Sequence, residues 1–162
     1  MNFRDAIKNH VVVIDGAMGT MVQDLDLSDA AYGGPSYKML SDILVFSRPE
    51  AIRDIHLRYF RSGSWAVETN TFGASHLRLA EYSFDGLDLA EFPKISGVTD
   101  LRKLNYDELA YHMNKQGARL AREAAEIHRA EPGFDARPLY VLGSIGPSNW
   151  VLSSTKANLR RA

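Results

Sequence analysis

Cysteine is absent from the 162 residues of this chain. Its absence excludes a disulfide framework, a thiolate nucleophile and a cysteine-ligated zinc site formed by these residues alone. The five histidines are spread along the sequence without the short spacing that metal ligands on one element show. We therefore expect no metal site built only from this chain.

Long apolar runs and an excess of one charge are also missing. The longest apolar runs, Val11–Ile14 and Ile43–Phe46, fall far short of the ~20 residues that a membrane span needs. With 19 basic and 20 acidic residues the net charge is −1, which gives no basic surface typical of nucleic-acid binding. The charged first ten residues lack the apolar centre of a secretory signal. These features predict a cytoplasmic protein without a membrane or nucleic-acid partner.

Three short apolar runs are typical of buried parallel strands: Val11–Asp15, Trp65–Asn70 and Leu139–Ser144. Helical patterns lie between them, so the order of elements predicts an α/β fold with a parallel sheet. At this level a doubly wound sheet and a (β/α)8 barrel are both open. In both architectures ligands bind at the carboxyl ends of the strands.

Capping patterns predict where the helices begin and end. Ser47 followed by Glu50 has the spacing of a capping box, and Gly63 is placed to end that helix. Asn105, with a glutamate three residues later, predicts the start of a longer helix. Residues 84–104, which contain scattered glycine and proline, are predicted to form an irregular insertion.

The first predicted strand ends in Asp15, Gly16 and Ala17. Taken alone, this aspartate–glycine pair favours a tight turn in which Asp15 caps the next segment. Consecutive backbone amides after a strand can also hold a carboxylate, and Asp15 could accept hydrogen bonds from an ammonium group. Together these features would suit the zwitterionic end of an amino acid.

The other two strands end in a similar way. The second strand ends in Glu68, Asn70, Thr71 and Phe72. These residues predict either an internal hydrogen-bond network or the polar floor of a ligand site, with Phe72 as its aromatic wall. A glycine-rich segment from 143 to 150 closes the third strand, where it predicts either a glycine–proline turn or a further part of the same ligand site. The recurrence of small and polar residues at the same end of every strand favours a shared site. His76 follows the second strand, and the sequence offers it no evident partner.

These motifs resemble the homocysteine S-methyltransferase family. The segments D-G-A-M-G-T, E-T-N-T-F-G-A and G-S-I-G-P occur here in the family's order and span nearly the whole chain. The similarity is strongest to the homocysteine-binding domain of the cobalamin-dependent methionine synthases. The resemblance implies a (β/α)8 TIM-type barrel with its site at the carboxyl ends of the strands. The residues it places in the homocysteine pocket are Asp15, Gly16, Ala17, Glu68, Asn70, Thr71, Phe72, Ser144 and Gly146.

The resemblance also implies cofactors. In the family, a zinc ion bound by three cysteine thiolates lowers the pKa of the homocysteine thiol. The resulting homocysteine thiolate attacks the methyl group of methylcobalamin. Methyltetrahydrofolate then supplies a new methyl group to the cobalamin. The family's cysteines lie in later strands, and a complete barrel needs ~250 residues. We therefore expect residues 1–162 to form a partial barrel of about three βα units that is inactive alone. Its partners would be the rest of the barrel and the cobalamin and folate modules.

Two other functions remain open. A partial barrel exposes strand edges and an apolar face, so the chain could be a non-catalytic module that assembles with itself or with the missing half. The other possibility is a related methyltransferase that uses betaine or S-methylmethionine as the methyl donor, because none of the residues discussed above determines which donor binds.

Overall fold

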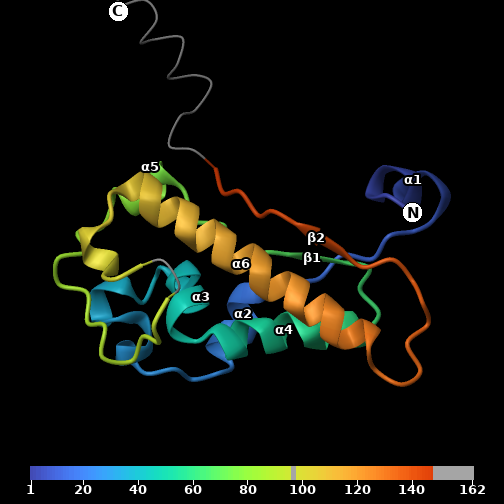
Figure 1. Ribbon diagram of the computed structural model, residues 1–162, viewed down its shortest axis with the longest axis horizontal. Coiled ribbons are helices and arrows are strands. Elements are labelled where there is room, and N and C mark those ends of the chain that lie inside the picture. The colour runs from blue at the N-terminus through green and yellow to red at the C-terminus, as the bar shows by residue number, and fades with distance from the viewer. Residues whose placement is uncertain (96–97, 148–162) are drawn as a thin grey trace, which may run out of the picture.

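The computed structural model describes residues 1–95 and 98–147 of the chain (Figure 1). The part of the predicted domain from residue 148 onward lies outside the described residues. The helices and strands are α1 (Phe3–Asn9), α2 (Met18–Gln23), α3 (Leu44–Ser47), α4 (Pro49–Arg61), β1 (Ala66–Glu68), α5 (His76–Leu79), α6 (Tyr106–Arg129) and β2 (Tyr140–Leu142). Short 3-10 helices occur at Asp29–Tyr32, Pro35–Tyr37, Ser41–Ile43 and Leu101–Lys103. Within the described part of the chain, no helix is long and apolar enough to cross a membrane.

The sheet is parallel, as the order of elements predicts. β1 pairs with β2 in the register Ala66–Tyr140 and Glu68–Leu142. On its other side β1 receives an isolated parallel bridge from Ile14 to Ala66. The parallel α/β class is therefore confirmed, with β1 between its two neighbours. Completion of these elements into a (β/α)8 barrel stays a prediction.

The first predicted strand differs from the expectation of a buried run. Only Ile14 of Val11–Asp15 pairs with β1, and Val11 and Val13 are 87% and 50% exposed. The prediction of a fully buried strand is wrong, because Val11, Val13 and Ile14 are all exposed. A continuous apolar run predicts that both faces are covered, yet it carries no information on where the covering residues lie.

The start of α4 also differs from the prediction. Ser47 is the last residue of α3 and makes no capping hydrogen bond, so the predicted capping box with Glu50 is wrong. α4 begins at Pro49, whose fixed backbone angle suits the first helical position and which has no N–H that needs a cap. The predicted stop is confirmed, since Gly63 follows the C-cap and adopts φ +104°.

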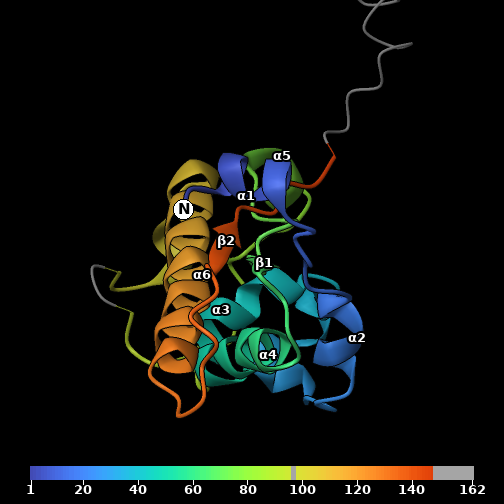
Figure 2. The same ribbon diagram turned by 90° about the vertical axis from the view of Figure 1, so that its right-hand side faces the viewer.

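The long helix α6 holds the sheet in place. The predicted capping box at its start is confirmed. The Glu108 N–H donates to the side-chain oxygen of Asn105, and the Asn105 N–H donates to the carboxylate of Glu108. α6 packs along α4, and in Figure 2 α6 lies beside β2 while α4 lies below β1. The buried residues of this contact include Phe60, Val67 and Ala124. The strand ends described below are therefore anchored to two packed helices.

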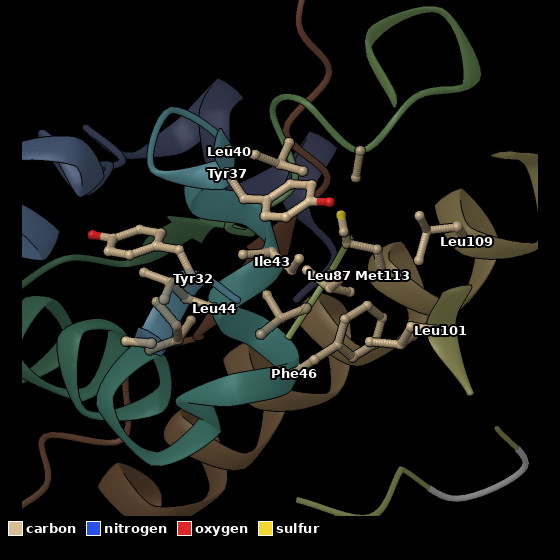
Figure 3. Close-up of a cluster of buried hydrophobic side chains, with 14 of the residues drawn as sticks. Tyr32, Tyr37, Leu40, Ile43, Leu44, Phe46, Leu87, Leu101, Leu109 and Met113 are labelled. Atoms are coloured by element: carbon tan, nitrogen blue, oxygen red, sulfur yellow. The ribbon is translucent and has the colours of Figure 1, made fainter. Parts of the chain in front are cut away.

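The larger core lies away from the strands, between α3, the start of α6 and the insertion (Figure 3). The described residues of this segment, 84–95 and 98–104, contain one 3-10 helix and a bridge between Ile95 and Val98, and they are otherwise irregular. They nevertheless bury Phe84, Leu87 and Leu101 in this core. The insertion is therefore a packed part of the fold.

Candidate functional site

The structure brings together one predicted site residue from each of the three strand ends. Both carboxylate oxygens of Asp15 accept the backbone N–H of Glu68 at 3.0 Å. The hydroxyl of Ser144, which follows β2, donates to Oε2 of Glu68 at 3.3 Å. The Asp15 carboxylate, the backbone and carboxylate of Glu68 and the Ser144 hydroxyl thus connect three separate segments at the carboxyl end of the sheet. We refer to Asp15, Glu68 and Ser144 as the carboxylate cluster.

The Asp15 carboxyl is half-buried, and its electrostatics reflect this. Burial and the nearby charge of Glu68 raise its pKa, the hydrogen bond from the Glu68 N–H lowers it, and the resulting pKa is about 6. The group is therefore largely ionised at neutral pH, although its charge is poorly solvated. A bound cation would compensate for the water that the Asp15 carboxylate loses on burial, which makes Asp15 a suitable partner for an ammonium group.

Gly16 and Ala17 follow Asp15 directly and lie on the surface, just before α2. Among the described residues, neither backbone N–H has a hydrogen-bond acceptor. The hydroxyl of Tyr59 lies 3.4 Å from where a Cβ of Gly16 would stand. Burial and the charge of Asp15 both raise the pKa of Tyr59. Tyr59 therefore borders the site from α4, a contact that its helical spacing in the sequence does not reveal.

A chain of hydroxyl groups fixes the end of β1 to the end of β2. The Ser144 N–H donates to Oγ1 of Thr69 at 3.1 Å, the Thr69 and Thr71 hydroxyls are 2.6 Å apart, and Thr71 donates to the Ser144 carbonyl at 3.1 Å. Thr69 and Thr71 are both buried. Thr71 was predicted as a pocket residue, and the structure shows that its hydroxyl is engaged in this internal network. Thr69, which the prediction omitted, is its centre.

Asn70 lies apart from the carboxylate cluster. Its amide donates to the Ser41 carbonyl at 2.9 Å, and the side chain is buried. Next to this contact, the buried carboxylate of Asp42 accepts the Gly73 N–H at 2.7 Å. Burial raises the pKa of Asp42. Asn70 and Asp42 together tie the loop after β1 to the segment before α3. No local sequence signal marks Asp42 for this position.

Phe72 and Gly146 form a second, separate part of the predicted site. The Gly146 N–H donates to the Phe72 carbonyl at 2.9 Å, and a Cβ at Gly146 would stand 2.4 Å from that oxygen. Phe72 is 61% exposed and, with Gly146 and Arg78, borders a cavity of about 360 Å³. This cavity is not lined by any member of the carboxylate cluster. The structure therefore divides the predicted pocket into the cluster and this neighbouring hollow.

The described residues contain no group of three or more histidine, aspartate or glutamate side chains placed to hold a metal ion. His76 does have a partner that the sequence did not indicate, because its Nδ1 lies 2.8 Å from Oδ1 of Asp107. Both side chains are exposed, so this pair is a surface contact between α5 and the first turn of α6.

Comparison with known proteins gives consistent results. Residues 12–161 match the family model described as homocysteine S-methyltransferase. Two similar solved structures are of the homocysteine methyltransferase MmuM from Escherichia coli. Its oxidized form is 26% identical with a TM-score of 0.61, over 89% of this chain and 40% of that one. Its metallated form is 24% identical with a TM-score of 0.61, over 96% of this chain and 43% of that one. The chain thus spans about two fifths of the length of these relatives.

Proposed function

The chain belongs to the homocysteine S-methyltransferase family, and from this premise we propose that it forms the amino-acid-binding part of a homocysteine-methylating enzyme. The observation that supports this role is the carboxylate cluster, in which Asp15, Glu68 and Ser144 meet at the carboxyl ends of neighbouring parallel segments. Ligands of parallel α/β sheets bind at this end.

Each part of the homocysteine zwitterion has a proposed partner. The ammonium group binds the carboxylates of Asp15 and Glu68, because a cation stabilises two acidic groups held close together. The carboxylate of the substrate accepts hydrogen bonds from the backbone N–H groups of Gly16 and Ala17, which donate to no acceptor among the described residues. Phe72 and Gly146 border the second, separate cavity, where the substrate side chain or the donor would lie.

The reaction of the family transfers a methyl group to sulfur. A bond forms between the homocysteine sulfur and the methyl carbon while the bond from that carbon to the donor breaks, and the thiol proton is lost. Zinc would supply the acidity of the thiol. The residues of this chain do not fit such a site, because the chain has no cysteine and its described part has no other metal-ligand group. The chain's proposed contribution is therefore to bind and orient homocysteine, and we expect no turnover from it alone.

The partners and the donor follow from the same proposal. Because the chain spans about two fifths of its solved relatives, the metal ligands would come from the remaining strands of a (β/α)8 barrel. Similarity to the methionine synthases supports methylcobalamin, recharged from methyltetrahydrofolate, as the donor. Betaine or S-methylmethionine is the alternative donor.

Binding of homocysteine to the purified chain tests the proposed pocket. In a calorimetric titration under reducing conditions, we expect Asp15→Asn to weaken binding at least about tenfold, since a charged hydrogen bond is worth about 1.5–3 kcal/mol. Asp24→Asn removes a charge from an exposed position nine residues away and should leave the affinity within about twofold of the wild type. Equal homocysteine affinities of the Asp15→Asn variant and the wild type would show that Asp15 does not contact the ligand. Formation of methionine by the chain alone would contradict its expected inactivity.

A second candidate is a non-catalytic module that assembles through its exposed strands. The observation that favours it is the exposure of apolar strand residues: Val11 is 87% exposed, Ile14 47% and Ile145, just after β2, 86%. These residues belong to the two outer segments beside β1, whose outer edges have no partner among the described strands. Light scattering across a concentration series distinguishes the candidates. A mass that stays at one chain argues against this assembly.

A further inference from the structure

A basic cavity of about 420 Å³ lies between α6, the junction of α3 and α4, and the insertion. Four residues of α6 line it: His112, Lys115, Gln116 and Arg119. Their spacing of three, four and seven residues places them on one face of the helix. Lys94 of the insertion borders the same cavity. Neither aspartate nor glutamate is among the described residues that line it.

The charges in this cavity are poorly compensated. Among the described residues, neither Lys94 nor Lys115 forms an ion pair, and the Lys115 ammonium instead lies 5.6 Å from the centre of the Tyr111 ring. Arg119 has one distant, exposed partner, Glu123 at 3.6 Å. Lys115 and Arg119 are four residues apart on the helix, a spacing at which like charges repel. A cleft lined by one sign of charge concentrates ions of the opposite sign.

The opposite wall of the cavity is apolar and comes from other parts of the fold. Phe46 and Pro49 lie where α3 meets α4, while Pro93 and Ile95 belong to the insertion. Phe46 is fully buried in the main core, so this wall is held in place by packing (Figure 3). The cavity volume is within the range of about 300–1,000 Å³ that small-molecule sites occupy. An occupant would touch α6, the α3–α4 junction and the insertion together.

We propose that this cavity binds a small organic anion of the phosphate monoester class, with its phosphate on Lys94, Lys115 and Arg119 and its apolar part on Pro49 and Ile95. Three permanent cations match a phosphate monoester, which carries nearly two negative charges near neutral pH. Lysine and arginine are the side chains that hold phosphate best. None of the lining residues belongs to the proposed homocysteine pocket, so the two sites are independent.

Phenyl phosphate is the probe that tests this site, because it joins a phosphate to one aromatic ring. An NMR titration of the isotopically labelled chain at a fixed ionic strength of about 0.15 M keeps screening constant. We expect saturable binding of one molecule per chain, with the largest shift changes in residues 93–95 and 112–119. Lys115→Gln should weaken binding at least about tenfold. Lys94→Gln, in the insertion, should do the same and serves as a second variant if the first folds poorly.

Arg122→Gln is the matched control, because it removes the same charge from the same helix but lines a different cavity. It should change the affinity less than about twofold. Equal weakening by Arg122→Gln and Lys115→Gln would show diffuse attraction to a basic helix and overturn the site. A titration without saturation would overturn it as well. Inorganic phosphate should bind more weakly than phenyl phosphate, and equal affinities would refute the role of the apolar wall.

Discussion

Replacement of His56 tests whether the interior of the protein contains an uncompensated imidazole. His56 lies on α4 with no exposed surface, and in the described part of the chain neither ring nitrogen has a hydrogen-bond partner. Burial lowers its pKa from 6.5 to about 4. Leucine has a similar volume and no polar atom, so His56→Leu removes two unpaired nitrogens without leaving a large cavity.

The expected effect on stability depends on pH. Between pH 6.5 and about 4 the imidazole of the unfolded chain is protonated while the folded one stays neutral. The unfolded state therefore binds more protons, and His56 lowers the unfolding free energy as the pH falls through this range. The two pKa values correspond to about 3 kcal/mol of lost stability at pH 4. At pH 7 the buried unpaired group itself costs about 1–3 kcal/mol, which His56→Leu should recover.

Urea denaturation followed by circular dichroism at pH 7, 6, 5 and 4.5 measures both effects. The His56→Leu variant should be more stable than the wild type at pH 7, and its advantage should grow as the pH falls. His10→Gln replaces an exposed histidine and is the matched control, which should follow the wild-type profile. A variant that is less stable at pH 7 and keeps the wild-type pH dependence would show that His56 makes a stabilising contact, and would refute the reasoning.

Three further outcomes are expected. Glu131 accepts hydrogen bonds from Arg61 across the ends of α4 and α6, and its pKa is lowered to about 2, so Glu131→Gln should destabilise the fold in urea at pH 7. That difference should shrink as the pH falls from 4.5 toward 2, where the wild-type carboxyl becomes protonated. A Cβ at Gly117 would stand 2.5 Å from Cγ2 of Thr71, so Gly117→Ala should cost about 1–3 kcal/mol of unfolding free energy. Because the pKa of Asp15 is about 6, homocysteine affinity measured by calorimetry should fall when the pH is lowered from 7.5 to 5.

Local chemistry explains the parts of the fold that the sequence predicted well. The capping box at Asn105 involves residues three positions apart, and the structure contains it. The stop at Gly63 depends on a backbone angle that glycine adopts without strain. The parallel pairing of β1 and β2 also follows from the alternation of apolar runs and helical patterns. The first two signals each lie within one short stretch of the chain, whereas the third depends on the order of elements along the chain.

A competing neighbour in one case, and partners that are distant in sequence in another, explain the parts of the fold that the sequence predicted poorly. Ser47 has the right spacing from Glu50, yet it ends the preceding helix because Pro49 starts α4 without a side-chain cap. The insertion has no regular pattern, although it buries Leu87 and Leu101 in the main core. Composition identifies these residues as apolar, and only the packed fold shows which surface they cover.

The candidate site combines both kinds of information. The recurrence of polar strand ends predicts that such residues converge on one face, because neighbouring parallel strands end at the same edge. Hydrogen bonds connect Asp15, Glu68 and Ser144 at this edge, and their role in a ligand site stays a prediction. The recurrence could not predict that Asn70 would turn toward Ser41, since that contact depends on a segment 29 residues away. The Glu68 N–H holds the Asp15 carboxylate in place before any ligand arrives, and burial weakens its solvation at the same time. An aspartate that only closed a turn would need no second strand to hold it. The anchoring therefore favours a binding role for Asp15.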